Sequence, residues 1–94
     1  MSAEIVHDEA RGRFTHERDG HTSYLAYRRL DEGTVDFVST FTPPELRGRG
    51  IAARIVKRAL EWADAGGLKV VPTCWFVAEY VERDPSWRRV IAGR

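Results

Sequence analysis

The most informative segment of this chain is Pro43-Pro44-Glu45-Leu46-Arg47-Gly48-Arg49-Gly50-Ile51-Ala52-Ala53. Two glycines stand one residue apart between arginines, and a helical pattern follows at once. Glycine permits positive φ and lets the backbone approach a ligand closely. The first turn of a helix adds unpaired N–H groups and the positive end of the helix dipole. Arg47 and Arg49 add charge at the rim, so the segment has the features of a phosphate or pyrophosphate cradle.

Ahead of this segment, the sequence predicts three strands joined by short turns, which together form an antiparallel meander. Asp19-Gly20 is a strong hairpin signal. The double proline Pro43-Pro44 ends the last strand, because proline has no backbone N–H to donate. Alternation within that strand places Val35, Phe37 and Phe41 on one face. The predicted strands are Arg13–Arg18, Thr22–Leu30 and Thr34–Thr42.

After this segment, the apolar residues no longer alternate with polar ones but recur every three or four positions. Arg49–Ala65 is therefore predicted to be an amphipathic helix, which Gly66-Gly67 ends. Leu68–Thr73 follows as a short strand, and its apolar Val70-Val71 indicates a position inside the sheet. Phe76–Arg83 is predicted as a second helix, which ends before a proline. The order β-β-β-α-β-α predicts an α/β (α+β) fold with a mixed sheet.

Composition narrows the class of protein. The 94 residues are expected to form a single domain, covering 1–94. Fifteen basic and 14 acidic residues give a net charge of +1, which disfavours a nucleic-acid partner. The single cysteine, Cys74, excludes an internal disulfide, and no histidine has ligand spacing with it, so no metal is expected. No signal-like or membrane-spanning run is present, and we expect a cytoplasmic protein without a membrane partner.

Two interpretations of the glycine segment rest on this segment alone, without a second motif elsewhere in the chain. Gly48-x-Gly50-x-x-Ala53 fits a dinucleotide-binding fingerprint, but that site needs an acidic residue after the next strand. Val70-Val71-Pro72 offers none, and the segment follows a meander instead of opening a βαβ unit. The other interpretation, a loop that only caps the helix, stays open.

A third interpretation comes from a family resemblance. Arg47-Gly48-Arg49-Gly50-Ile51-Ala52 resembles the R/Q-x-x-G-x-G/A signature of the GNAT superfamily of N-acetyltransferases. Val71-Pro72-Thr73-Cys74-Trp75-Phe76-Val77 resembles the P-x-C-x-F segment of the compact YjdJ-like branch. The likeness covers Thr40–Trp87, about half the chain. It implies a GNAT-like fold and an acetyl-CoA-binding N-acetyltransferase that moves acetyl to an unidentified amine.

The resemblance also implies which residues bind acetyl-CoA. Backbone N–H groups of the signature loop would hold its pyrophosphate, and Phe41 and Thr42 would pair with the pantetheine arm. The thioester would then reach Thr73-Cys74. Three basic residues of the helix would either meet an adenosine 3′-phosphate or simply face water: Arg54, Lys57 and Arg58. The loop residues that carry the cofactor role are Arg47, Gly48, Arg49, Gly50, Ile51 and Ala52.

Cys74 is the candidate catalytic residue. It precedes a predicted helix, whose dipole favours a thiolate, and the resemblance makes this position an active-site cysteine. The thiolate would accept the acetyl group or lie beside the thioester, whereas a small buried apolar residue is the plain alternative. The YjdJ-like branch usually has a histidine where this chain has Ser39. The remaining candidates for a general base are a water, Glu79, Tyr80, His16 and His21.

Two other functions remain open at this point. A non-catalytic acyl-CoA binder would bind the ligand without turnover, and Ser39 favours it. A small nucleic-acid-binding module would use the basic residues Arg47, Arg49, Arg54, Lys57 and Arg58, and the near-neutral charge speaks against it. Relative to longer acetyltransferases, the resembling branch lacks segments that form the acceptor pocket. An open acceptor side suits a large, protruding substrate, such as an amine on a protein, or no substrate at all.

Overall fold

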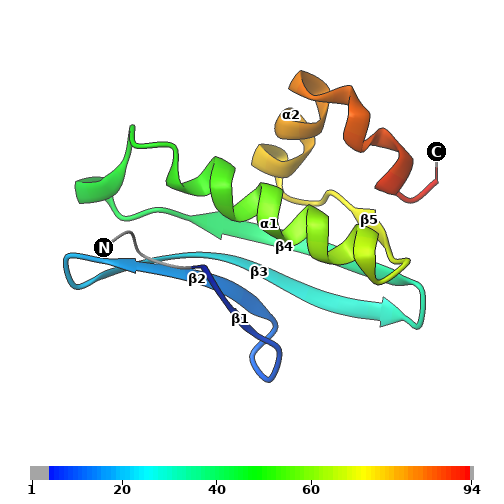
Figure 1. Ribbon diagram of the computed structural model, residues 1–94, viewed down its shortest axis with the longest axis horizontal. Coiled ribbons are helices and arrows are strands. Elements are labelled where there is room, and N and C mark those ends of the chain that lie inside the picture. Colours follow the sequence, from blue (N-terminus) through cyan, green and yellow to red (C-terminus); the bar gives the residue numbers. More distant parts are fainter. Residues whose placement is uncertain (1–4, 94) are drawn as a thin grey trace.

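The computed structural model describes residues 5–93. The elements in chain order are β1 (Ile5–Asp8), β2 (Arg13–Arg18), β3 (His21–Asp31), β4 (Thr34–Phe41), a 3₁₀ turn (Pro44–Leu46), α1 (Ile51–Ala65), β5 (Lys69–Val71), α2 (Trp75–Arg83) and a second 3₁₀ turn (Pro85–Val90). The five strands form one sheet in the order β1-β2-β3-β4-β5. Strands β1 to β4 are antiparallel to their neighbours, and β5 runs parallel to β4. Figure 1 shows α1 lying along the sheet, with α2 and the C-terminal segment beyond it.

The predicted α/β class, the three meander strands and both helices are confirmed, but the meander has a fourth strand that the sequence analysis missed. Strand β1 pairs with β2, and its side chains explain why. The ring of His7 stacks on Phe14 with centroids 4.1 Å apart and meets the edge of Trp62 at 4.8 Å. His7 Nε2 also shares a hydrogen bond of 2.6 Å with the hydroxyl of Tyr27. Contacts of His7 with distant residues therefore hold this strand against the rest of the sheet.

The prediction that Val70-Val71 lies inside the sheet is wrong. Strand β5 is the last strand of the sheet, and only an isolated parallel bridge joins Val70 to Ile91 beyond it. The N–H of Ala92 donates to the carbonyl of Val70 at 2.8 Å. Val70 is nonetheless fully buried in the core. Strand β5 therefore has one neighbouring strand, β4, and its other edge is covered by the C-terminal segment. This cover is consistent with its apolar sequence.

The prediction that Phe41 shares a face with Val35 and Phe37 is also wrong, because β4 contains a bulge. Tyr27 of β3 pairs with Phe37, whereas Ala26 pairs with Ser39, so Val38 is an extra residue. One inserted residue reverses the alternation of every side chain that follows it. Phe41 consequently lies on the sheet face opposite α1, beside Tyr24 and 42% exposed.

Helix α1 supplies one side of the hydrophobic core. It contacts β2, β3, β4 and β5, and its buried residues recur every three or four positions. In the last turn of α1, Asp64 holds the C-terminal segment, because Arg89 donates to both of its carboxylate oxygens, at 2.6 and 3.0 Å. Within residues 5–93, no helix is long and apolar enough to cross a membrane. The buried stripe of α1 consists of Ile51, Ile55, Val56, Ala59, Leu60 and Ala63.

Gly12 and Gly20 offer a matched test of the packing between β1, β2 and β3. Both have positive φ, +66° and +76°, but a Cβ at Gly12 would lie 2.7 Å from the carbonyl oxygen of Tyr27, whereas one at Gly20 meets nothing within 4 Å. Gly20→Ala should lower the free energy of unfolding by roughly 1–2 kcal/mol, the cost of a left-handed alanine. Gly12→Ala should lower it further, because β3 must also move. Urea unfolding of both variants tests this, and equal losses would contradict it.

Candidate functional site

The glycine loop, residues 47–52, forms the entrance to α1. Gly48 has φ +82° and Gly50, the N-cap of α1, has φ +74°, a left-handed conformation that side chains other than glycine rarely adopt. A Cβ at either position would meet nothing within 4 Å, so the space in front of the loop is open. Among residues 5–93, no backbone hydrogen bond uses the N–H groups of residues 48–53. The loop therefore presents a set of free donors at a helix N-terminus, as an anion site requires.

The two arginines of the loop face neighbouring protein groups. Arg47 Nε donates to the carbonyl of Thr42 at 3.0 Å, which ties the loop to the end of β4. Arg49 lies 3.9 Å from the carboxylate of Asp19, at the tip of the β2–β3 hairpin. The expectation that both side chains add charge at the rim is thus only partly met. The side chain of Arg47 fixes the conformation of the loop through its hydrogen bond to Thr42. Arg49 is half-exposed, and its ion pair with Asp19 is long, at 3.9 Å.

A gap opens between β4 and β5 next to the loop. The two strands pair only from Thr34–Asp36 to Lys69–Val71. Beyond that ladder, the N–H of Cys74 donates to the carbonyl of Phe37 at 3.0 Å. Within the part of the chain that the structure describes, the rest of β4 has no strand partner on this side. Its outward backbone groups are available to a ligand with amide groups of its own, since unpaired strand edges readily take up such partners.

A cavity of about 230 Å³ lies against the glycine loop and extends to Thr42, just after β4. Its walls come from the end of β4, from the first turn of α1 and from α2. Phe76 is the α2 residue on its wall, so the cavity extends from the free N–H groups to the first turn of the helix that Cys74 caps. The residues that line it are Thr42, Leu46, Arg47, Gly48, Gly50, Ile51, Ala52, Ala53 and Phe76.

Cys74 is the N-cap of α2 and is only 8% exposed. Its Sγ lies 3.6 Å from Oγ1 of Thr40 and shares a weak hydrogen bond with it. Thr40 reaches the sulfur because of the bulge at Val38. Thr40 pairs with Leu25 and Phe37 pairs with Tyr27. Because Leu25 and Tyr27 lie on the same face of β3, Thr40 and Phe37 both face α1, although three positions separate them in β4. The residues on either side of the cysteine, Thr73 and Trp75, are exposed.

The candidates for a general base do not gather around Cys74. Burial raises the pKa of Tyr80 above its ordinary value of 10.0, which keeps the phenol protonated. Glu79 is exposed and paired with Arg83 at 3.5 Å. Ser39 follows the bulge on the face opposite Thr40. Among the described residues, the side-chain hydrogen bond of Cys74 with Thr40 is its only one.

His16 lies elsewhere, in a buried polar pair that sequence reasoning did not identify. It faces Ser23 across β2 and β3, and the two side chains are 2% and 0% exposed. Neither His16 Nδ1 nor Ser23 Oγ has a hydrogen-bond partner among the described residues. His16 lies two strands from β4, about 10 Å away at the usual strand spacing. No sequence signal distinguishes this pair from the apolar residues around it.

The remaining predicted positions are scattered. Arg54, Lys57 and Arg58 are exposed on α1, and His21 lies 3.8 Å from the carboxylate of Glu45. The side chain of Phe41 lies on the sheet face opposite α1, so only the backbone of this residue can face the gap between β4 and β5. In the described range 5–93, no group of three or more His, Cys, Asp or Glu side chains is arranged to hold a metal ion.

Comparison with known proteins identifies the class that this fold and site define. The family model of the GCN5-related N-acetyltransferases matches residues 13–90, and the chain belongs to that family. Its glycine loop, its helix and its parallel β4–β5 pair all lie within the matched range.

Particular relatives agree with this assignment. The chain is 34% identical over 86 residues to Protein NATD1 of Xenopus tropicalis, a match covering 89% of this chain and 79% of that protein. It is 35% identical over 83 residues to Protein NATD1 of Homo sapiens, covering 86% and 74%. The NMR solution structure of a GCN5-like candidate N-acetyltransferase from Staphylococcus aureus superposes with a TM-score of 0.75 at 26% identity, covering 97% of this chain and 89% of that one.

His16 makes the stability of the fold depend on pH. Burial lowers its pKa below the ordinary value of 6.5, and the nearby charge of Arg54 lowers it further. Burial likewise lowers the pKa of His7. Both histidines therefore take up protons on unfolding, so stability is fully present above pH 6.5 and falls as the pH drops toward the folded pKa values. Urea unfolding at about pH 7.5 and 5.5 should show this loss, and it should be smaller in His16→Gln. An unchanged difference between the two pH values in that variant would exclude His16 as a source.

Proposed function

We propose that this protein binds acetyl-CoA and transfers its acetyl group to an amine. The observation that carries the proposal is one cavity that touches the free N–H groups of the glycine loop, Thr42 just after the partly unpaired strand β4, and Phe76, two residues after Cys74. These three parts match a ligand that has a pyrophosphate, an arm with two amide groups and a terminal thioester. Membership of the GCN5-related family supports the same ligand, since that family generally uses acetyl-CoA.

The phosphate end of the ligand would lie at the N-terminus of α1. Backbone N–H groups of Gly48, Arg49, Gly50, Ile51 and Ala52 are the donors, supported by the helix dipole. Arg47 contributes through its backbone and by fixing Thr42. The pantetheine arm would run along the backbone of Phe41 and Thr42. Arg54, Lys57 and Arg58 lie on the exposed side of α1, where an adenosine 3′-phosphate would find a cation.

Cys74 would act at the thioester. Its thiolate attacks the carbonyl carbon of the acetyl group, a new C–S bond forms to Cys74, and the bond to the CoA sulfur breaks, so that CoA leaves as a thiolate. A neutral amine then attacks the acetylated cysteine, the C–S bond breaks, and the amine proton passes to solvent. Thr40 would hold the sulfur in place through its hydroxyl. A free thiol suits the reducing cytosol, where we place this protein.

A second candidate function is an acyl-CoA binder without turnover. It is favoured by the surroundings of Cys74, where Thr40 supplies a hydroxyl and no carboxylate or imidazole among residues 5–93 makes a hydrogen bond to the sulfur. Nucleic-acid binding through the loop arginines has less support. Arg47 donates to Thr42, and Arg49 is near Asp19.

Acetyl-CoA binding is tested by calorimetric titration of the full chain and of two glycine variants. Gly50→Glu should weaken binding at least about 100-fold, because it places a side chain and a negative charge among the phosphate donors. Gly67→Glu is the matched control at the other end of α1: its φ is +69°, and a Cβ there also meets nothing within 4 Å. It should bind like the parent chain. If Gly50→Glu binds acetyl-CoA with normal affinity, the loop is not part of the binding site. If the parent chain binds acetyl-CoA no more tightly than ADP, acetyl-CoA is not its ligand.

The role of Cys74 is tested separately. Cys74→Ala should keep the affinity for acetyl-CoA while losing transfer to amines. In the parent chain, mass spectrometry after mixing with acetyl-CoA alone should show one acetyl group attached at Cys74. Undiminished transfer by Cys74→Ala would eliminate the acetyl-cysteine step and leave direct attack by the amine. Binding without transfer by the parent chain would favour the acyl-CoA binder.

A further inference from the structure

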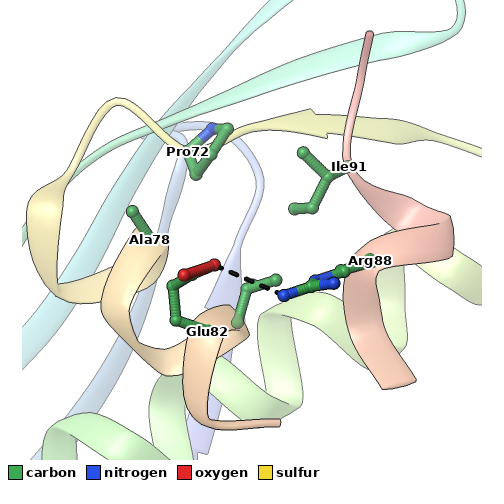
Figure 2. A pocket seen from close by; sticks show the side chains of 6 residues that line it. Pro72, Ala78, Glu82, Arg88 and Ile91 are labelled. Atoms are coloured by element: carbon green, nitrogen blue, oxygen red, sulfur yellow. Dashed lines mark ion pairs between the residues drawn. The ribbon is translucent and has the colours of Figure 1, made fainter. Parts of the chain in front are cut away.

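A second cleft, of about 280 Å³, lies between α2 and the C-terminal segment. This segment runs along the edge of β5 that faces away from β4. Figure 2 shows Glu82 and Arg88 directed toward one another across it, with Pro72, Ala78 and Ile91 around them. The carboxylate and the guanidinium are 3.7 Å apart, too far for a hydrogen bond, and both side chains are mostly exposed. The rest of the lining is apolar, with Val81 and Ile91 buried.

Two residues that line the cleft, Pro72 and Ala78, stand on either side of Cys74 in the chain. Pro72 precedes the cysteine by two residues, and the N–H of Ala78 donates to the carbonyl of Cys74 at 3.1 Å. Cys74, Ala78 and Glu82 are spaced at four-residue intervals, which places them in one row along α2. The row spans about 12 Å at 1.5 Å per residue. The side chain of Glu82 leans back toward the helix N-terminus, as helical side chains do, and so toward Cys74.

The charges of the cleft select for a head group that carries both signs. A lone ammonium or a lone carboxylate would have to separate the Glu82–Arg88 pair and leave one member without its partner. An α-amino acid head offers its ammonium to Glu82 and its carboxylate to Arg88, so both charges stay compensated. An unbranched side chain would then lie against Ala78 and Val81 and point along the row toward Cys74.

We propose that this cleft is the acceptor site and that the acceptor is a free α-amino acid whose side chain ends in a primary amine, such as lysine or ornithine. The proposal rests on the function proposed above. The three-carbon stem of ornithine or the four-carbon stem of lysine would extend from a head group at Glu82 and Arg88 toward the acetyl group at Cys74. There the neutral side-chain amine attacks the acetyl carbon. The C–N bond forms as the bond to sulfur breaks, and the amine proton passes to solvent.

The test compares acceptors that differ by one group, with CoA release as the readout at saturating acetyl-CoA. Cadaverine lacks the carboxylate of lysine, 6-aminohexanoate lacks the α-amine, and Nα-acetyl-lysine amide stands for a lysine within a protein. The kcat/KM for lysine should exceed that for each of the other three at least tenfold. Equal use of cadaverine would overturn the proposal, and preference for Nα-acetyl-lysine amide would assign the site to protein acceptors instead.

Variants connect that preference to the cleft. Arg88→Gln should reduce the advantage of lysine over cadaverine at least fivefold, because the carboxylate of lysine then has no guanidinium to meet. Glu82→Gln should do the same for lysine over 6-aminohexanoate. Arg83→Gln is the matched control, because Arg83 also pairs with a glutamate of α2, at 3.5 Å, but does not line the cleft. An equal effect of Arg83→Gln would show that general charge, and not the cleft, determines the preference.

A binding measurement separates this proposal from the one it rests on. Lysine added to the CoA-saturated protein should shift the backbone amide NMR signals of Ala78, Glu82 and Ile91, whether or not transfer occurs. If acetyl-CoA binds and these signals do not move at millimolar lysine, the acceptor proposal fails and the proposed function stands. If acetyl-CoA itself does not bind, the proposed function fails.

Discussion

The extra residue in β4 determines how the rest of the site is built. Without the bulge at Val38, regular alternation along β4 would place Thr40 on the face away from α1. With it, Thr40 and Phe37 lie on the same face, and the sulfur of Cys74 meets the threonine hydroxyl at 3.6 Å. The ladder between β4 and β5 also ends just before this point, at Asp36 and Val71. A β-bulge bends its strand and increases the local twist, which is a physical reason for the two strands to part here.

Helix α1 has two functions that come from different faces of the same element. Its apolar stripe covers the sheet and closes the core, while its first turn leaves backbone N–H groups free beside a cavity. The position of the donors is therefore set by core packing, since Ile51 is buried directly after Gly50. In the same way α2 buries Val77 and Val81 and so fixes both Cys74 at its start and Glu82 near its end.

Much of this architecture was predictable from the sequence because it is encoded in local patterns. Alternation and the double proline gave the three meander strands, and apolar spacing gave both helices. The positive φ of Gly48 and Gly50 follows from the residue type. Strand β1 was missed because it depends on His7 contacting residues far along the chain, and the face of Phe41 was missed because a bulge leaves no clear mark in the sequence.

For the site, the loop was predictable from physical chemistry and the place of Cys74 from resemblance. The Cys74–Thr40 contact needed the register of β4, which only the structure supplies. His16 and Ser23 were beyond prediction for a similar reason. Polar residues on a strand normally indicate an exposed face, yet this pair lies under α1. The cleft between Pro72 and Arg88 depends on the return of the C-terminal segment along β5, which joins residues that lie far apart in sequence.

The bond from Arg47 to the carbonyl of Thr42 has a consequence for binding entropy. It links the end of β4 to the glycine loop, so the strand edge and the free N–H groups keep a fixed relation before any ligand arrives. A site that is pre-organised in this way loses less conformational freedom on binding, because the loop has been ordered during folding. Two glycines with open space around them would otherwise leave this connection many backbone conformations. One side chain thus holds a flexible backbone in a single binding geometry.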